Sequence, residues 1–170
     1  MLKMIIAVAL AGIALAPLAA REPGSRQTRE FVQAAGQSDQ FEILEGQTAL
    51  TESKDPQVLD FAQRMIADHS QTSAALVQAT SRSGLLPPPK AISEDQAHLL
   101  SALQGLRGKE FDQAYFRHQV LAHRSALTVQ QAYAASGDDA AVRQAASSAT
   151  PVIASHLAMA EEMSTKLGGQ

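Results

Sequence analysis

The sequence lacks several residue types, and each absence narrows the kind of protein it can encode. It contains no cysteine, so neither a disulfide framework nor a lipid attached through cysteine is possible. Tryptophan is absent and aromatic residues amount to 4% of the chain, whereas alanine is abundant; this composition favours closely packed helices over a β-sandwich. The formal charge of −3 gives no electrostatic reason to expect nucleic-acid binding. The 170 residues suffice for one domain with its own core.

Residues 1–20 differ in composition from the rest of the chain. Lys3 is followed by a long apolar run that ends in the small residues of "PLAA". This pattern is typical of a secretory signal peptide, and we expect cleavage near Ala20; a retained membrane anchor is the alternative. The polar residues 21–27 are interpreted as a flexible leader, and residues 28–167 as a single domain. We therefore expect an exported, periplasmic protein that is not inserted in a membrane after cleavage.

Capping residues and apolar periodicity predict helices throughout this domain. Thr28 is expected to cap the first helix, and Asp55 with Pro56 to begin the second. Three consecutive prolines within residues 84–90 cannot join a helix and form a stiff, extended connector. The predicted long helices cover residues 29–53, 56–83, 110–136 and about 140–167.

Two features complete the predicted topology. Ser93 and Gln96 resemble a capping box, which places a short helix on the connection as far as about residue 106. Asp138 or Asp139 is expected to cap the last long helix, and Pro151 to kink it. Two helical hairpins joined by one longer crossover are the layout of an all-α, ferritin-like four-helix bundle.

Several polar residues fall on the apolar faces of these helices. With a rotation of about 100° per residue, Glu42, His69 and His156 lie close to the centres of three apolar faces. On the third long helix, His118 and His123 lie on opposite flanks of the apolar face, and periodicity does not choose between them. Counted from the predicted turns at about 1.5 Å per residue, these groups lie within about one helical turn of the same level. They are therefore expected to meet inside the bundle.

A buried carboxylate is unfavourable unless it is paired, hydrogen-bonded or bound to a cation. One glutamate and up to three histidines from different helices suit a single divalent transition metal: zinc, copper, nickel or iron. The two Glu-x-x-His motifs of a ferritin-type di-iron centre are absent, because isoleucine or valine stands three residues before each histidine. The alternative interpretation is a hydrogen-bonded network that fixes helix register without metal. His98 is expected to be solvated, and Asp68 to be a surface charge.

Four segments also carry a resemblance to a known family: "FVQAAGQSDQFEILEGQTAL", "DPQVLDFAQRMIADHS", "FDQAYFRHQVLAH" and "ATPVIASHLAMA". Together they resemble the bacterial exported family called domain of unknown function 4142, whose members are regarded as ferritin-like and are often described as exported or outer-membrane proteins. The resemblance prefers His123 over His118, and Thr150 departs from the leucine that the family tends to show before the proline. Its motifs map onto Glu42, Gly46, Phe61, Asp68, His69, Tyr115, Gln119, His123, Pro151 and His156.

The family's activity is not established, so functional hypotheses depend on the cluster. The leading hypothesis is an exported protein that binds one transition-metal ion through Glu42, His69, His123 and His156, for sequestration, sensing or stress protection. The alternative is a structural or partner-binding envelope protein, and a redox or hydrolytic enzyme with an open metal position is a third option. No nucleophile elbow or phosphate-binding glycine loop is present, so the sequence gives no support for nucleophilic catalysis, and no catalytic motif is identified. An envelope partner and a homo-oligomer both stay open.

Overall fold

Five helices account for most of the residues that the computed structural model describes, which are residues 23–168. No strand occurs within this range, and the all-α prediction is confirmed. The predicted signal peptide and the first two residues of the leader lie outside the described part of the chain. The long helices are α1 (Arg26–Glu52), α2 (Pro56–Arg82), α4 (Gly108–Ser136) and α5 (Ala140–Gly168), and the short crossover helix is α3 (Glu94–Gln104).

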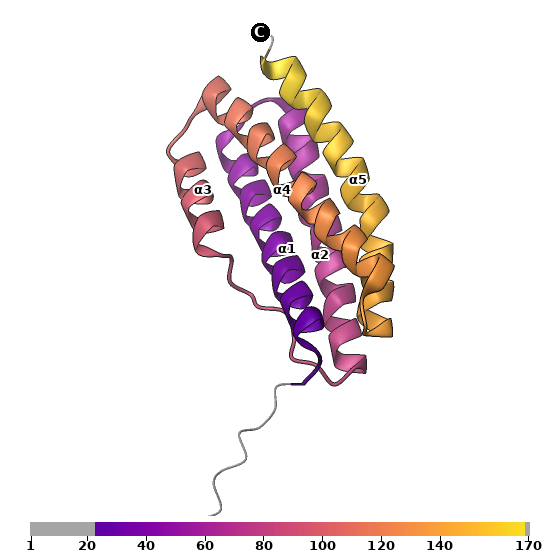
Figure 1. Cartoon of the computed structure of the whole chain (residues 1–170). Helices are drawn as coiled ribbons and strands as arrows, with labels where there is room; N and C mark the ends of the chain where they lie inside the picture. The colour runs from indigo at the N-terminus through magenta and orange to yellow at the C-terminus, as the bar shows by residue number, and fades with distance from the viewer. Residues whose placement is uncertain (1–22, 169–170) are drawn as a thin grey trace, which may run out of the picture.

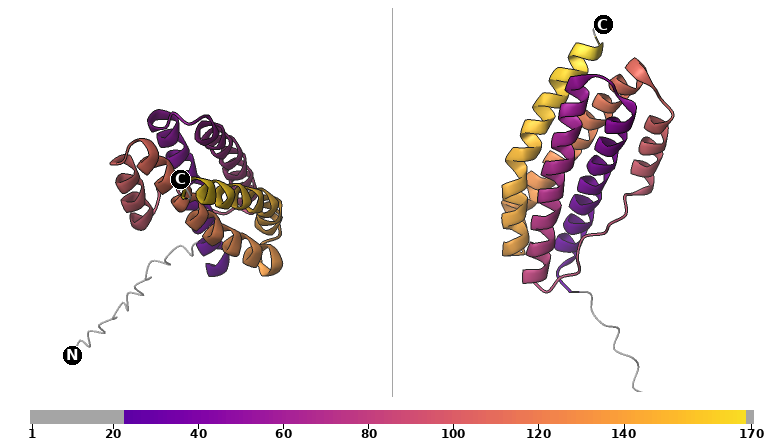
Figure 2. Two further views of the ribbon diagram at one scale, coloured as in Figure 1. Left: turned by 90° about the horizontal axis from the view of Figure 1, so that it is seen from above. Right: turned by 180° about the vertical axis from the view of Figure 1, so that it is seen from behind.

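The four long helices form two antiparallel hairpins, α1–α2 and α4–α5, as predicted (Figure 1). In the bundle α1 packs against α4 and α2 against α5, while α3 lies outside the bundle beside α1 (Figures 1 and 2). The proline-rich connector runs across α1 at Gly36, where an added Cβ atom would lie 2.5 Å from the Cβ of Pro88. None of the helices in the described range combines the length and apolar character needed to cross a membrane.

Most helix starts follow the predicted local chemistry. The Asp55 carboxylate accepts from the backbone N–H of Gln57 at 2.8 Å at the start of α2. Ser93 and Gln96 form the predicted capping box. At the start of α5, the carboxylate of Asp139, rather than that of Asp138, accepts a hydrogen bond from the backbone N–H of Val142.

The predicted start of α1 was wrong. Ser25, not Thr28, caps the helix by accepting from the Thr28 N–H at 3.0 Å, so α1 already includes two residues assigned to the leader. Thr28 is buried, and its hydroxyl lies 2.6 Å from the hydroxyl of Tyr133 and bonds Asp138. Thr28 therefore ties α1 to the α4–α5 turn. At the other end of the sequence, α5 continues through Pro151, and the kink there stays a prediction.

The apolar core is divided into layers along the bundle. One cluster, which includes Phe61, Phe111 and Phe116, lies toward the α1–α2 turn, and another, which includes Phe31 and Tyr133, lies toward the α4–α5 turn. Buried polar residues occupy the level between them: Asp39, Glu42, Glu45, His69, Gln119, His123 and His156. A polar layer enclosed by two apolar layers is shielded from bulk water, which strengthens every electrostatic interaction within it.

Candidate metal centre

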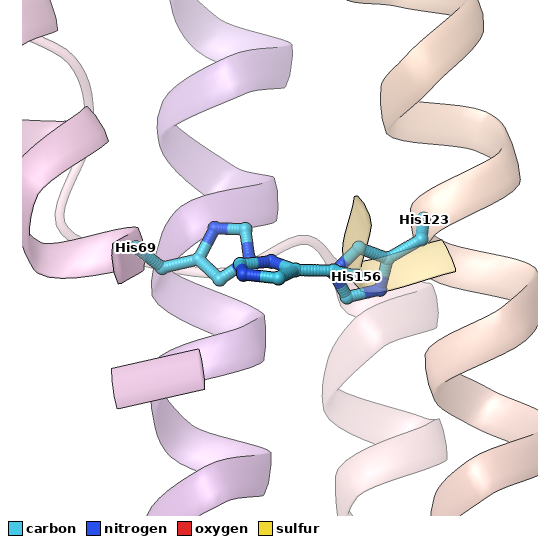
Figure 3. A group of neighbouring side chains, drawn as sticks. All are labelled: His69, His123 and His156. Carbon is cyan, nitrogen blue, oxygen red and sulfur yellow. The ribbon is translucent and has the colours of Figure 1, made fainter. Parts of the chain in front are cut away.

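Three histidines, each from a different helix, meet in the middle of the bundle (Figure 3). His69 comes from α2, His123 from α4 and His156 from α5, and none is more than 2% exposed. One ring nitrogen of each lies within 4.8 Å of a ring nitrogen of the other two. The Nε2 atoms of His69 and His123 are 3.4 Å apart, and all three ring centroids are separated by 5.2 to 5.4 Å.

Glu42 supplies a carboxylate from the fourth long helix, α1. It is fully buried, and its Oε2 lies 2.5 Å from Nε2 of His69, while its Oε1 lies 3.6 Å from Nδ1 of His123. Neither carboxylate oxygen has an aligned hydrogen-bond donor among the described residues. A fully buried carboxylate without such donors calls for a cation at close range, either an imidazolium or a metal ion.

The outward-facing nitrogen of each histidine has its own hydrogen-bond acceptor. Nδ1 of His69 donates to Asp39 at 2.9 Å, and Nδ1 of His123 donates to the Gln119 carbonyl at 2.8 Å. Nε2 of His156 donates to Asp68 at 2.9 Å. Each bond places a proton on the outer nitrogen, so the inner nitrogen is the one that can bind a metal once it carries no proton.

The inner nitrogen of His156 shows this most clearly. Its Nδ1 is buried and has no hydrogen-bond partner among the described residues. The inner faces of the four residues thus present three imidazole nitrogens and a carboxylate. Zinc bonds of 2.0 to 2.1 Å in a tetrahedral site separate neighbouring ligand atoms by about 3.3 Å, close to the spacing of the His69 and His123 nitrogens.

The charges in the cluster are strongly coupled. Burial opposes ionisation of Glu42, but the nearby His123 and His69 outweigh it and lower the pKa of Glu42 to about 2. Burial likewise disfavours charged His69, yet Glu42 and Asp39 raise its pKa to about 10. Burial lowers the pKa of His123, and it lowers the pKa of His156 to about 4 despite the bond to Asp68. Without metal, His69 therefore carries the positive charge that neutralises Glu42.

Residues 14–163 match the family described as domain of unknown function (DUF4142). The chain belongs to this family. A fragment of DUF305 from Deinococcus radiodurans has a similar crystal structure, with a TM-score of 0.71 and 17% identity over 87% of this chain and 99% of that one. At this identity the likeness shows the fold alone, a helical bundle. No curated protein matches the sequence.

The four residues expected from the sequence of this DUF4142 chain come together in the structure. Glu42, His69, His123 and His156 share one level of the bundle, and the preference of the family motif for His123 agrees with its position. The other candidate on α4, His118, faces a different way: its Nδ1 donates to Glu45 at 2.7 Å. The separation follows from the helix, because residues five positions apart lie about 140° apart around its axis.

Two other expectations concern residues beside the cluster. His98 is exposed, as expected, with its side chain 78% accessible. Asp68, interpreted as a surface charge, is partly exposed but has a second role that the sequence did not show. Its side chain is 33% exposed, but its carboxylate accepts the Nε2–H bond of His156. Asp68 lies on the flank of α2 that faces α5, so it reaches solvent and the cluster at once.

Sequence reasoning missed two buried carboxylates on α1. Asp39 accepts from His69 and from the hydroxyl of Thr72, both at 2.9 Å. Glu45 accepts from His118 and, at 2.9 Å, from the side-chain amide of Gln119. Each is three residues from Glu42, the spacing that keeps side chains on one helical face, and that spacing was the available signal.

Gly46 explains how α1 comes close enough for Glu42 to reach His69. A Cβ atom at Gly46 would lie 3.0 Å from a side-chain carbon of Ile66 and 3.1 Å from the carbonyl oxygen of Ala62, both on α2. A side chain at this position would push Ile66 or the Ala62 carbonyl away by a few tenths of an ångström, so glycine permits the closest approach of the two helices. The glycine stands one turn from Glu42, so close packing is imposed next to the site.

Proposed function

We propose that this protein binds one divalent transition-metal ion at the centre of the bundle, through His69, His123, His156 and Glu42. The observation that carries the proposal is the set of outer hydrogen bonds. Asp39, the Gln119 carbonyl and Asp68 each hold one nitrogen of a histidine so that the other nitrogen faces inward. Three inward nitrogens and a carboxylate form a cation site when His69 releases its inner proton to the solvent, and their imidazole-rich chemistry suits zinc, copper, nickel or iron.

The role that best suits such a site is sequestration or stress protection in the periplasm. The apolar clusters on both sides and the burial of all four residues favour tight, slow binding over turnover of a substrate. The sequence of residues 1–20 supports export, with cleavage near Ala20 and a mature protein that contains the whole bundle from α1 to α5. An ion held by four protein ligands keeps no open position for catalysis.

A second candidate function is a structural or partner-binding envelope protein in which the cluster is a hydrogen-bonded network. The position of His69 favours it, because the ring contacts both Glu42 and Asp39 and its pKa is raised to about 10. A charged His69 neutralises much of the buried acidic charge without a metal. In this case the protein would be purified without metal, and added ions would not change its stability.

Titration of metal-free protein distinguishes the two functions. We expect Co²⁺ to give the visible absorption of a four-coordinate site, to saturate at about one ion per chain, and to be displaced by Zn²⁺. The variant His69→Ala/His156→Ala should lose this signal. The control His98→Ala, which removes an exposed histidine, should keep it. Absence of saturable binding by the unaltered protein would rule out the proposed function.

A further inference from the structure

The buried cluster approaches the surface between α2 and α5. A surface pocket of about 300 Å³ there is lined by His156 together with Arg64, Asp68, Pro151, Val152 and Ser155. A larger cavity of about 430 Å³ between α1, α3 and α4 touches Asp39 but none of the three histidines. Among these two openings, the α2–α5 pocket is the one whose wall includes a residue of the cluster.

His156 differs from the other two histidines in what holds it. The partners of His69 and His123 are buried, since Asp39 is 4% exposed and Gln119 is inaccessible. The partner of His156, the Asp68 carboxylate, is one-third exposed and lies in the wall of the pocket. Solvent and ions therefore reach the acceptor of His156 directly.

We propose that Asp68 is the docking point for the incoming metal ion, and that the ion gains access to the cluster by displacing His156 from Asp68. This inference rests on the proposed metal site. The carboxylate exchanges the N–H bond of His156 for a bond to the divalent cation. The imidazole is then free to turn, and its unpaired Nδ1, the adjacent Glu42 and the other two histidines provide stronger ligands further inside.

The backbone of α5 is suited to this movement. Pro151 has no N–H. The carbonyl of Ser147, four residues earlier on α5, therefore lacks the helical hydrogen bond that residue 151 would normally donate. Pro151 also lines the pocket itself. A helix that lacks one of its backbone hydrogen bonds next to the pocket yields more easily when His156 turns.

The positive charge of Arg64 at the pocket provides a test that leaves the cluster untouched. Arg64 is exposed and lines the pocket, whereas Arg82 is exposed on the same helix, 18 residues or about 27 Å away. Arg64→Gln should raise the association rate constant of Co²⁺ severalfold at low ionic strength, an effect that salt should diminish. Arg82→Gln should leave that rate within about 1.5-fold of the original value, because at this distance its charge acts on the pocket far more weakly than that of Arg64.

Filling the pocket tests the route itself. Val152→Trp should slow both Co²⁺ association and its release to excess EDTA by about tenfold or more, with the dissociation constant changed by less than about twofold, because a barrier on the path affects both directions equally. The control Ala122→Trp fills the larger cavity between α1, α3 and α4, and it should change neither the association rate nor the release rate. Melting temperatures establish that each variant is folded.

The outcomes separate this inference from the proposed function. Equal effects of Arg64→Gln and Arg82→Gln would overturn the docking role, whether or not Val152→Trp folds. Slowing by Ala122→Trp with normal rates in Val152→Trp would show that the ion passes between α1 and α4. In either case Co²⁺ would still bind at equilibrium and the proposed function would stand. If no Co²⁺ binds at all, the proposed function itself is wrong.

Discussion

The chemistry of the cluster depends on where each imidazole carries its proton. A buried histidine with one nitrogen bonded to an acceptor has its tautomer fixed, and its other nitrogen is then available as a ligand. In this structure the acceptors come from three elements: Asp39 on α1, Asp68 on α2 and the Gln119 carbonyl on α4. They surround the cluster and direct the free nitrogens toward one point.

The first prediction concerns Asp39, which holds His69 but is not expected to touch the metal. Asp39→Asn should weaken Zn²⁺ binding by about 10- to 100-fold, because the loss of the negative charge reduces the basicity of His69 and loosens its orientation. Competition titration against a chromophoric chelator measures the change. Asp60→Asn, an exposed site on α2, should leave the affinity unchanged. Equal affinities for the two variants would contradict the role assigned to Asp39.

The second prediction concerns the stability of the metal-free protein in acid. The pKa of His156 is about 4 in the folded protein and about 6.5 in the unfolded chain. Between these values the unfolded chain binds more protons, so the free energy of unfolding should fall as the pH drops from 6.5 to 4, by at most about 3 kcal/mol from this residue. Glu42, with a lowered pKa, extends the loss toward pH 2.

Denaturant unfolding of the metal-free protein between pH 7.5 and 4.5 checks this slope. His156→Gln should flatten it, because the titrating group is gone, whereas His98→Gln should not. His69 acts in the opposite direction: its raised pKa gives stability that is complete below pH 6.5 and is lost as the pH rises through about 10. If the unaltered protein, His156→Gln and His98→Gln all showed the same dependence of unfolding free energy on pH, the loss of stability in acid could not be assigned to His156.

At the scale of the helices, Gly46 sets the distance between α1 and α2. Gly46→Ala should destabilise the protein by about 1 to 2 kcal/mol, because the clash with Ala62 and Ile66 exceeds the gain in helix propensity. It should also weaken Zn²⁺ binding, since α1 carries Glu42. Gly105→Ala, where the nearest atom lies 3.4 Å from an added Cβ, should change stability by less than about 0.5 kcal/mol. A neutral or stabilising Gly46→Ala would show that the helices adjust.

The helices were predictable where local chemistry decides. Asp55 with Pro56, and Ser93 with Gln96, begin helices through bonds within one turn, so the sequence alone identifies them. The start of α1 was not predictable, because Ser25 and Thr28 are both good caps. The choice between them depends on Tyr133 and Asp138, more than a hundred residues away, which hold Thr28 in the core.

The same division applies to the candidate site. Glu42, His69 and His156 were predictable because each lies at the centre of an apolar face. The choice of His123 over His118 required the family motif, since it depends on how α4 rotates against α1. The roles of Asp39, Glu45 and Asp68 depend on which helices become neighbours, and periodicity within one helix does not contain that information.

At the scale of the whole molecule, the apolar layers isolate the buried polar residues from water. The folded state is therefore stable only if the negative charge of the buried carboxylates is neutralised. Excess Zn²⁺ at about 100 times its dissociation constant should therefore stabilise the metal-free protein by about 2.7 kcal/mol, or about 5 to 10 °C in melting temperature. Calorimetry measures the shift. It should persist in His98→Ala and vanish in His69→Ala/His156→Ala; a shift in the double variant would place the binding elsewhere.

The most direct test of the central claim is the metal content of protein purified without chelators from the cells that make it. Elemental analysis should find about one transition-metal ion for each folded chain, and the same preparation of His69→Ala/His156→Ala should contain almost none. Protein that carries no metal, or the same amount in both preparations, would contradict the claim that the inward-facing imidazoles and Glu42 hold an ion.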